Sequence, residues 1–99
     1  MFVITRVIEL EKGFSESFVQ RFQNQSLVEK APGYIKKEIL INDQNPNVDV
    51  LRLSIYFEER DHFIAWEKSP EHLAMHQSKQ NKEKPQGLIN FKLEHFNTR

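Results

Sequence analysis

Two histidines, His72 and His76, are four residues apart in a stretch that opens with the sequence Ser69-Pro70-Glu71. Side chains at this spacing lie one turn apart on the same side of a helix, so the two imidazoles have the geometry of a metal-binding pair. The glutamate that follows the first histidine in zinc-protease helices is missing. From the residues alone, zinc binding is therefore less favoured than two polar side chains on a half-exposed helix.

Trp66 is the single tryptophan of the chain and closes a short segment, residues 60–67, with helical character. A large flat ring next to a helix junction serves equally well for core packing and for contact with a planar ligand. The pattern alone favours the core.

Arg6 is a charged residue in the middle of an apolar run, residues 2–10, which has the β-branched and aromatic composition of a strand buried on both faces. Alternation places it among apolar neighbours on one face: Phe2, Ile4, Ile8 and Leu10. A guanidinium there is costly unless an anion or several acceptors meet it. A structural ion pair with Glu38 or Glu58 and a ligand carboxylate are equally open alternatives.

In the first half of the chain, the strand that carries Arg6 is followed by a predicted helix and a predicted β-hairpin. Phe14, Phe18 and Phe22 recur every fourth residue, which predicts an amphipathic helix with Ser15 as its N-cap. We expect it to run to about residue 29 or 30, because Ala31-Pro32-Gly33 stops a helix. Strands at 34–41 and 48–57, joined by a polar loop at 42–47, form an antiparallel hairpin.

The second half holds Trp66 and both histidines of the pair. Helical segments are expected at 60–67 and from Ser69 onward, since Ser at the cap and Pro at the first position are a coherent start signal. The second segment should turn Leu73 and either Met75 or His76 inward. A polar, solvated loop at 77–86 then leads to a last strand at 88–96.

The element order is β-α-β-β-α-β, which predicts an α+β, ferredoxin-like fold: one domain over residues 1–99, with a four-stranded antiparallel sheet and helices on one face. That arrangement leaves the other face of the sheet uncovered. Apolar residues on both faces of the first strand therefore favour a two-fold homodimer.

Composition narrows the class of protein. Fourteen basic and fourteen acidic residues cancel, so no summed field attracts nucleic acid or an anionic membrane. The chain has no cysteine, which excludes thiolate catalysis and cysteine-bound zinc or iron–sulfur sites and fits a reducing compartment. We expect a cytoplasmic protein, because neither a signal peptide nor an apolar run long enough to span a bilayer is visible.

Taken together, these segments resemble the antibiotic biosynthesis monooxygenase superfamily, and within it the Isd-type haem-degrading monooxygenases, over nearly the whole chain. The resemblance rests on the first strand and its closing Gly13, the helix with Glu16, Phe18, Arg21 and Phe22, and the Ala31-Pro32-Gly33-Tyr34 turn. Its most specific part is the stretch from Phe63 to Ser69, followed by Ala74-Met75-His76.

The resemblance implies a dimeric α+β barrel in which haem is both substrate and cofactor, opened with O2 and electrons from an external donor, so that iron is released. It assigns His76 as the axial iron ligand and Trp66 as a residue lying against the haem. Arg6 stands where those enzymes have a distal asparagine, so the third catalytic position departs from the family pattern. Phe22 and Phe63 are expected to line the pocket with them.

Two alternatives to this interpretation stay open. The first, which follows from that departure, is a haem-binding protein without turnover. The second is a cofactor-independent monooxygenase of small aromatic or quinol substrates, in which His76 acts as a base or hydrogen-bond donor.

Overall fold

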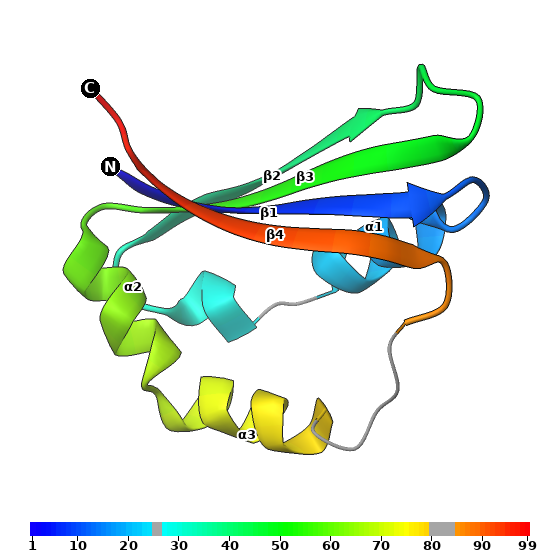
Figure 1. The fold of residues 1–99 in the computed structure, drawn as a ribbon. Helices are drawn as coiled ribbons and strands as arrows, with labels where there is room; N and C mark the ends of the chain where they lie inside the picture. The colour runs from blue at the N-terminus through cyan, green and yellow to red at the C-terminus, as the bar shows by residue number, and fades with distance from the viewer. Residues whose placement is uncertain (25–26, 80–84) are drawn as a thin grey trace.

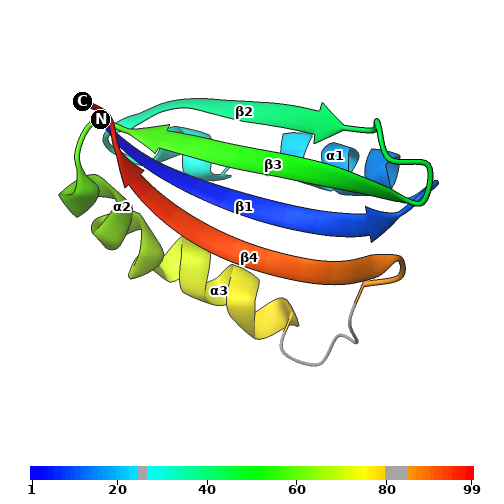
Figure 2. The same ribbon diagram turned by 45° about the horizontal axis from the view of Figure 1, so that its top comes forward.

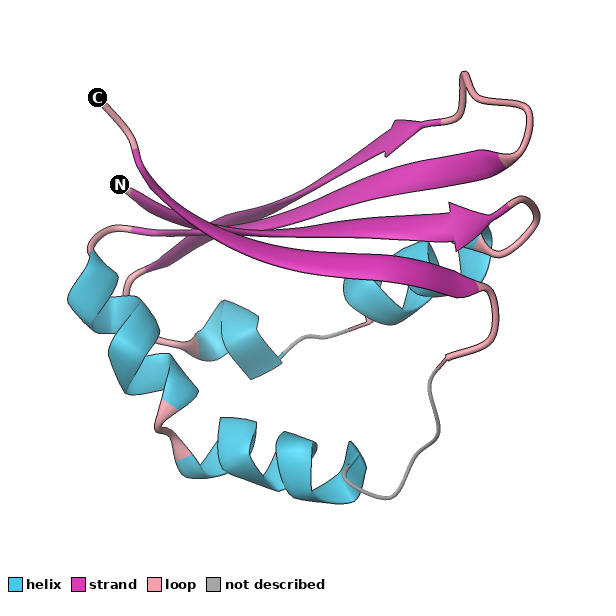
Figure 3. Cartoon of the chain, in the orientation of Figure 1, coloured by secondary structure: helices cyan, strands magenta, loops and turns pink. Residues whose placement is uncertain are grey.

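The computed structural model describes residues 1–24, 27–79 and 85–99, with the side chains of 75–79 outside the description. Its elements, in chain order, are β1 (Phe2–Glu11), α1 (Ser15–Gln23), the short 3₁₀ helix η1 (Leu27–Lys30), β2 (Tyr34–Asn42), β3 (Val48–Phe57), α2 (Arg60–Glu67), α3 (Pro70–Lys79) and β4 (Leu88–Asn97). The sheet order is β2-β3-β1-β4, and every neighbouring pair is antiparallel. All helices lie on one face of the sheet (Figure 1, Figure 3), which confirms the ferredoxin-like βαββαβ fold.

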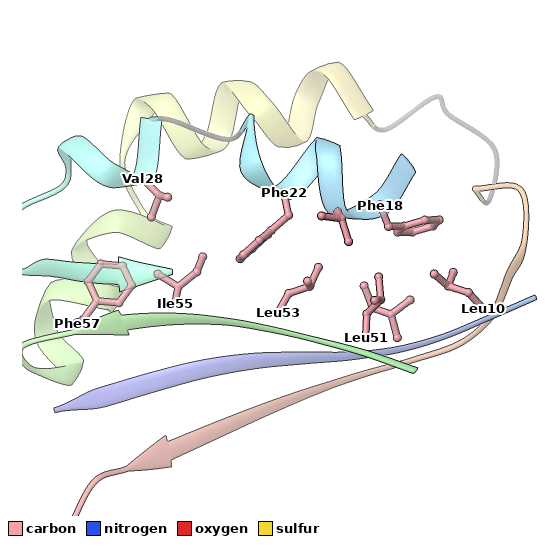
Figure 4. Close-up of a cluster of buried hydrophobic side chains, with 10 residues drawn as sticks. Leu10, Phe18, Phe22, Val28, Leu51, Leu53, Ile55 and Phe57 are labelled. Carbon is pink, nitrogen blue, oxygen red and sulfur yellow. The ribbon is translucent and has the colours of Figure 1, made fainter. Parts of the chain in front are cut away.

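Strand register decides which side chains meet the helices. In the β1–β3 pair, Ile8 lies opposite Leu51 and Ile4 opposite Ile55, so the even residues of β1 and the odd residues of β3 share the helix-facing side. Together with side chains from α1 and η1 they form the main core (Figure 4): Ile8, Leu10, Phe18, Val19, Phe22, Val28, Leu51, Leu53, Ile55 and Phe57. The predicted apolar face of β3 is therefore confirmed.

The first helix is shorter than the sequence predicted. It begins after Phe14, so Ser15 is its first residue and not the N-cap, and no side chain caps it. It ends at Gln23, where the backbone N–H of Asn24 donates to the Gln20 carbonyl at 3.0 Å. Four polar residues, 23–26, follow Phe22 and offer no apolar face to bury, and most helical stability comes from such packing. Val28 is the next buried side chain and belongs to η1.

The α2–α3 boundary is close to the prediction, and the end of α3 is not. Ser69 caps α3, because its Oγ accepts the backbone N–H of His72 at 3.2 Å. Leu73, expected inside, is 51% exposed. The helix continues to Lys79, so the predicted loop at 77–86 starts too early; residues 80–84 lie outside the described part of the chain.

The outer face of β1 is buried without a second subunit. Val3 and Thr5, which point away from the helices, are 6% and 4% exposed. The Thr5 and Ser54 hydroxyls lie 2.9 Å apart and hydrogen-bond to each other. Because β1 is an inner strand of a twisted sheet, side chains of β3 and β4 cover these residues. The two apolar faces of β1 therefore do not by themselves require a partner.

The two ends of the chain meet at one corner of the sheet (Figure 1). The Met1 ammonium donates to the Thr98 hydroxyl at 3.0 Å, and the Thr98 backbone N–H donates to the Met1 carbonyl at 3.0 Å. At the opposite end of the sheet, residues 43–47 join β2 to β3. None of the described helices is long and apolar enough to cross a membrane.

Candidate functional site

A cavity of about 780 Å³ is lined by residues of β1, β4 and the α2–α3 region. Figure 2 shows α2 and α3 lying along the β4 edge of the sheet. The walls of the cavity come from β1, β4 and the α2–α3 junction: Ile4, Arg6, Phe63, Glu67, Lys68, His72, Leu73, Phe91 and Leu93. Five of these nine side chains are apolar, and pockets of this size hold drug-sized ligands. The cavity is therefore suited to a flat, mostly apolar molecule that carries a few polar groups.

Arg6 lies in the wall of this cavity, opposite Leu53 on β3 and Leu93 on β4. Burial lowers the pKa of its guanidinium below the ordinary value, because an apolar setting disfavours the charged form. The predicted ion pair with Glu38 is wrong: Glu38 lies opposite Ser54, on the outer face, and accepts the Tyr56 hydroxyl at 3.1 Å. Glu58, the other proposed partner, is exposed beyond the end of β3.

A smaller cavity of about 190 Å³ adjoins the first, and the two share Arg6 and Phe91 in their walls. Phe22 lines this second space together with Arg21, whose guanidinium lies 5.3 Å from the centre of the Phe18 ring. The structure thus brings Arg6 into contact with both spaces, whereas Phe22 borders only the smaller one.

Phe63 is fixed in the cavity wall by an aromatic cluster. Its ring centre lies 5.6 Å from Phe2, 5.9 Å from Phe57 and 5.5 Å from His95. Tilted and edge-to-face contacts at these separations are the favourable arrangements for aromatic rings. The expectation that Phe63 lines the pocket agrees with its position.

Trp66 does not line the large cavity. It is half-buried against the core and borders a separate space of about 270 Å³ beside η1 and the Ala31-Pro32 turn. Its ring centre lies 5.4 Å from that of His72, which does line the large cavity. The indole is therefore one side chain removed from the space that contains Arg6.

Ser69 holds the junction between these two rings. Its hydroxyl donates to the Trp66 carbonyl at 2.6 Å and accepts the His72 backbone N–H at 3.2 Å. One side chain thus ends α2 and starts α3, which fixes the relative placement of Trp66 and His72.

His72 is a cavity residue that the sequence suggested only as half of a zinc pair. Its Nδ1 lies 2.8 Å from the Glu67 carbonyl oxygen. A carbonyl can only accept, so Nδ1 carries the proton, and in the neutral ring the lone pair is on Nε2. This hydrogen bond to a backbone carbonyl fixes the orientation and the tautomer of the His72 ring. His76 lies one turn further along α3, and its side chain is outside the description.

Five further wall residues were not predicted as pocket residues from the sequence: Ile4, Glu67, Lys68, Phe91 and Leu93. The alternation of the last strand placed Phe91 and Leu93 on one face but could not give their register against Arg6. No sequence signal separated Lys68 from other surface lysines.

Comparison with known proteins shows which protein family has this architecture. The family model described as antibiotic biosynthesis monooxygenase matches residues 1–78. The haem-degrading monooxygenase HmoA of Bacillus subtilis is 30% identical over 99 residues, which is 100% of this chain and 92% of that protein. A crystal structure from Bacillus cereus, attributed to the same family, superposes with a TM-score of 0.84 at 26% identity and covers 99% of this chain and 90% of its own.

The same fold also serves other oxygenases. The cofactor-independent oxygenase SnoaB of Streptomyces nogalater superposes with a TM-score of 0.63 at 15% identity, covering 99% of this chain and 92% of its own. That likeness concerns the fold alone. With a family model that spans most of the chain and a 30% identical relative aligned over the whole of this chain, this chain belongs to the antibiotic biosynthesis monooxygenase family.

Proposed function

We propose that this protein is a cytoplasmic haem-binding monooxygenase that opens the porphyrin ring and releases iron, using O2 and an external electron donor. The observation that carries the proposal is the cavity of about 780 Å³, walled by apolar side chains and a half-buried arginine, in a chain 30% identical to a haem-degrading monooxygenase. Haem would be both substrate and cofactor, as it is in the enzymes that the sequence resembles.

The wall of the cavity fits such a molecule in three respects. Ile4, Phe91 and Leu93 offer apolar surface to a flat macrocycle. The cavity wall also contains two positively charged side chains, Arg6 and Lys68, which suit an acidic ligand. On the α3 side, the flat ring of His72, oriented by the Glu67 carbonyl, offers a surface against which a macrocycle can pack.

Iron bound in the cavity would supply the redox chemistry, and the chain would contribute ligation, orientation and exclusion of water. We propose His76 as the iron ligand, because the resemblance assigns it and α3 carries it one turn beyond His72. The contact between Trp66 and haem stays a prediction, since the indole lies behind His72 in this structure.

Haemin titration tests the proposal. We expect a shifted Soret band with the wild type, no such shift with His76→Ala, and a retained shift with His72→Ala as the matched control on the same helix. A lost shift in His72→Ala alone would move the ligand to His72. If neither the wild type nor either variant shifts the Soret band, the protein does not ligate haem.

Turnover separates the remaining candidates. With ascorbate and O2, a haem monooxygenase loses its Soret band and releases iron that a chelator captures. Bound haem that survives this treatment would identify a haem-binding protein without turnover. The other alternative is a cofactor-independent oxygenase, which is what SnoaB is on the same fold. Oxygen uptake on a small quinol with haem-free protein would favour it.

The proposal includes a two-fold homodimer formed through the sheet face that the helices leave uncovered (Figure 1). Leu40 and Phe96 are 52% and 42% exposed, and they lie opposite Arg52 and Val3, which belong to that outer face. Apolar side chains at this exposure are typical of surfaces that bind another protein.

A further inference from the structure

Arg6 is a half-buried cation without an ion-pair partner among the described residues, and Glu67, the carboxylate that shares its cavity wall, is exposed. Within the described residues, neither a hydrogen bond nor an ion pair to its guanidinium is present, and Glu38 is bonded to Tyr56 on the other side of the sheet. Its opposite neighbours on the two flanking strands are both leucines. A charge in such a setting is strongly unfavourable unless something compensates it.

The position of Arg6 lets a ligand in the cavity compensate its charge. The residue borders both the large and the small cavity, so part of its side chain faces open space. Lys68 adds a second cation to the large cavity, but it is exposed at the rim of the α2–α3 junction. The planar fork of a guanidinium matches a carboxylate through two parallel hydrogen bonds, a geometry that a lysine ammonium lacks.

We propose that Arg6 is a carboxylate-binding residue, which makes the cavity selective for flat aromatic molecules that carry an acidic group. The inference deepens the proposed function, because the carboxylates of haem are the groups it would meet. It also applies to smaller aromatic acids and does not depend on iron.

Two pairs of probes test it, each differing only in the acidic group. The first is metal-free protoporphyrin IX against its dimethyl ester, and the second is 2-naphthoate against naphthalene-2-carboxamide. Binding is followed by quenching of Trp66, the single tryptophan, whose ring contacts a cavity residue. We expect the wild type to bind each acid about tenfold or more tightly than its neutral partner, the scale of one charge-assisted pair.

The variants assign that preference to one side chain. Arg6→Met should bind acid and neutral probe within about threefold of each other, and Arg6→Lys should keep part of the preference, because it retains charge without the fork. Arg60→Met, at an exposed arginine that begins α2 and lines neither of these two cavities, is the matched control and should behave like the wild type. A wild type without acid preference for both pairs, or an Arg6→Met that keeps it, would overturn the inference.

The porphyrin pair and the naphthalene pair also separate this inference from the proposed function. A protein that selects 2-naphthoate through Arg6 but binds no porphyrin has the carboxylate site and is not a haem enzyme. Thermal melting without ligand gives a second measurement. Arg6→Met should melt at least about 4 °C higher than the wild type, because it removes an uncompensated half-buried charge. A lower melting temperature would mean that Arg6 has a structural partner.

Discussion

At the scale of single residues, the two faces of the sheet differ in whether their polar side chains have hydrogen-bonding partners. On the outer face Tyr56 is satisfied: its hydroxyl donates to Glu38, and the Lys36 ammonium lies 4.6 Å from the centre of its ring. Burial, the hydrogen bond to Glu38 and the charge of Glu38 all raise the pKa of Tyr56 above its ordinary value. On the inner face Arg6 has no such partner among the described residues. Glu38 therefore lies on the opposite face of the sheet from Arg6 and is paired with Tyr56 there.

This pair predicts a loss of stability at alkaline pH. The folded pKa of Tyr56 is raised, so the protonated phenol contributes stability below its unfolded pKa of about 10, and that contribution is lost as pH rises through the folded value. Glu38→Gln keeps an acceptor and removes the charge, so its unfolding free energy should fall less between about pH 8 and about pH 11. Urea unfolding at both pH values measures this. Equal losses in the wild type and Glu38→Gln would contradict the assignment.

At the scale of elements, the turn after η1 depends on close contact between backbone and ring. Gly33 has φ +83°, and a Cβ built there would overlap the ring of His62 at the start of α2. The Gly33 carbonyl also accepts the backbone N–H of Glu58 at 2.8 Å. The turn therefore docks α2 beside the first residues of β2.

Two glycines allow a matched test of that contact. Gly13 also has positive φ, +94°, but a Cβ there would meet nothing within 4 Å. Gly13→Ala should lose about 1–2 kcal/mol of stability from backbone strain alone. Gly33→Ala should lose a further 1–3 kcal/mol or so, because the His62 ring must move as well. Denaturant unfolding of the two variants gives the difference, and equal losses would show that the ring adapts without cost.

Strands and helix starts could be predicted from the sequence, and helix ends largely could not. Alternation over residues 48–57 fixed β3, and Ser69-Pro70 fixed the start of α3, because these signals are local. The end of α1 depended on what its last turn packs against, which is a tertiary property. The site followed the same division: Arg6 was visible as a charge on an apolar face, whereas His72 reached the cavity only through the α2–α3 geometry.

At the scale of the whole molecule, the helices cover one face of the sheet and leave the other open (Figure 1). A covered inner face accommodates the cavity, and an exposed outer face with Leu40 and Phe96 suits association with a second copy. The site and the proposed dimer contact therefore lie on opposite sides of β1, so substitutions can alter one without touching the other.

The proposed dimer predicts a solution mass of twice the chain mass by light scattering after size-exclusion chromatography. Leu40→Glu combined with Phe96→Glu should reduce it to the mass of one chain, because two charges would have to be buried at the contact. Leu27→Glu, on η1 at 41% exposure on the helix side, is the control and should leave the mass unchanged. A wild type of single-chain mass would refute the dimer.

The hydrogen bonds between Met1 and Thr98 place the two ends of the described chain next to each other. A linker of a few glycines would close the backbone into a ring without pulling on β1 or β4. New ends opened within residues 43–47 would then leave every strand pairing intact, so a circularly permuted chain should keep the same sheet.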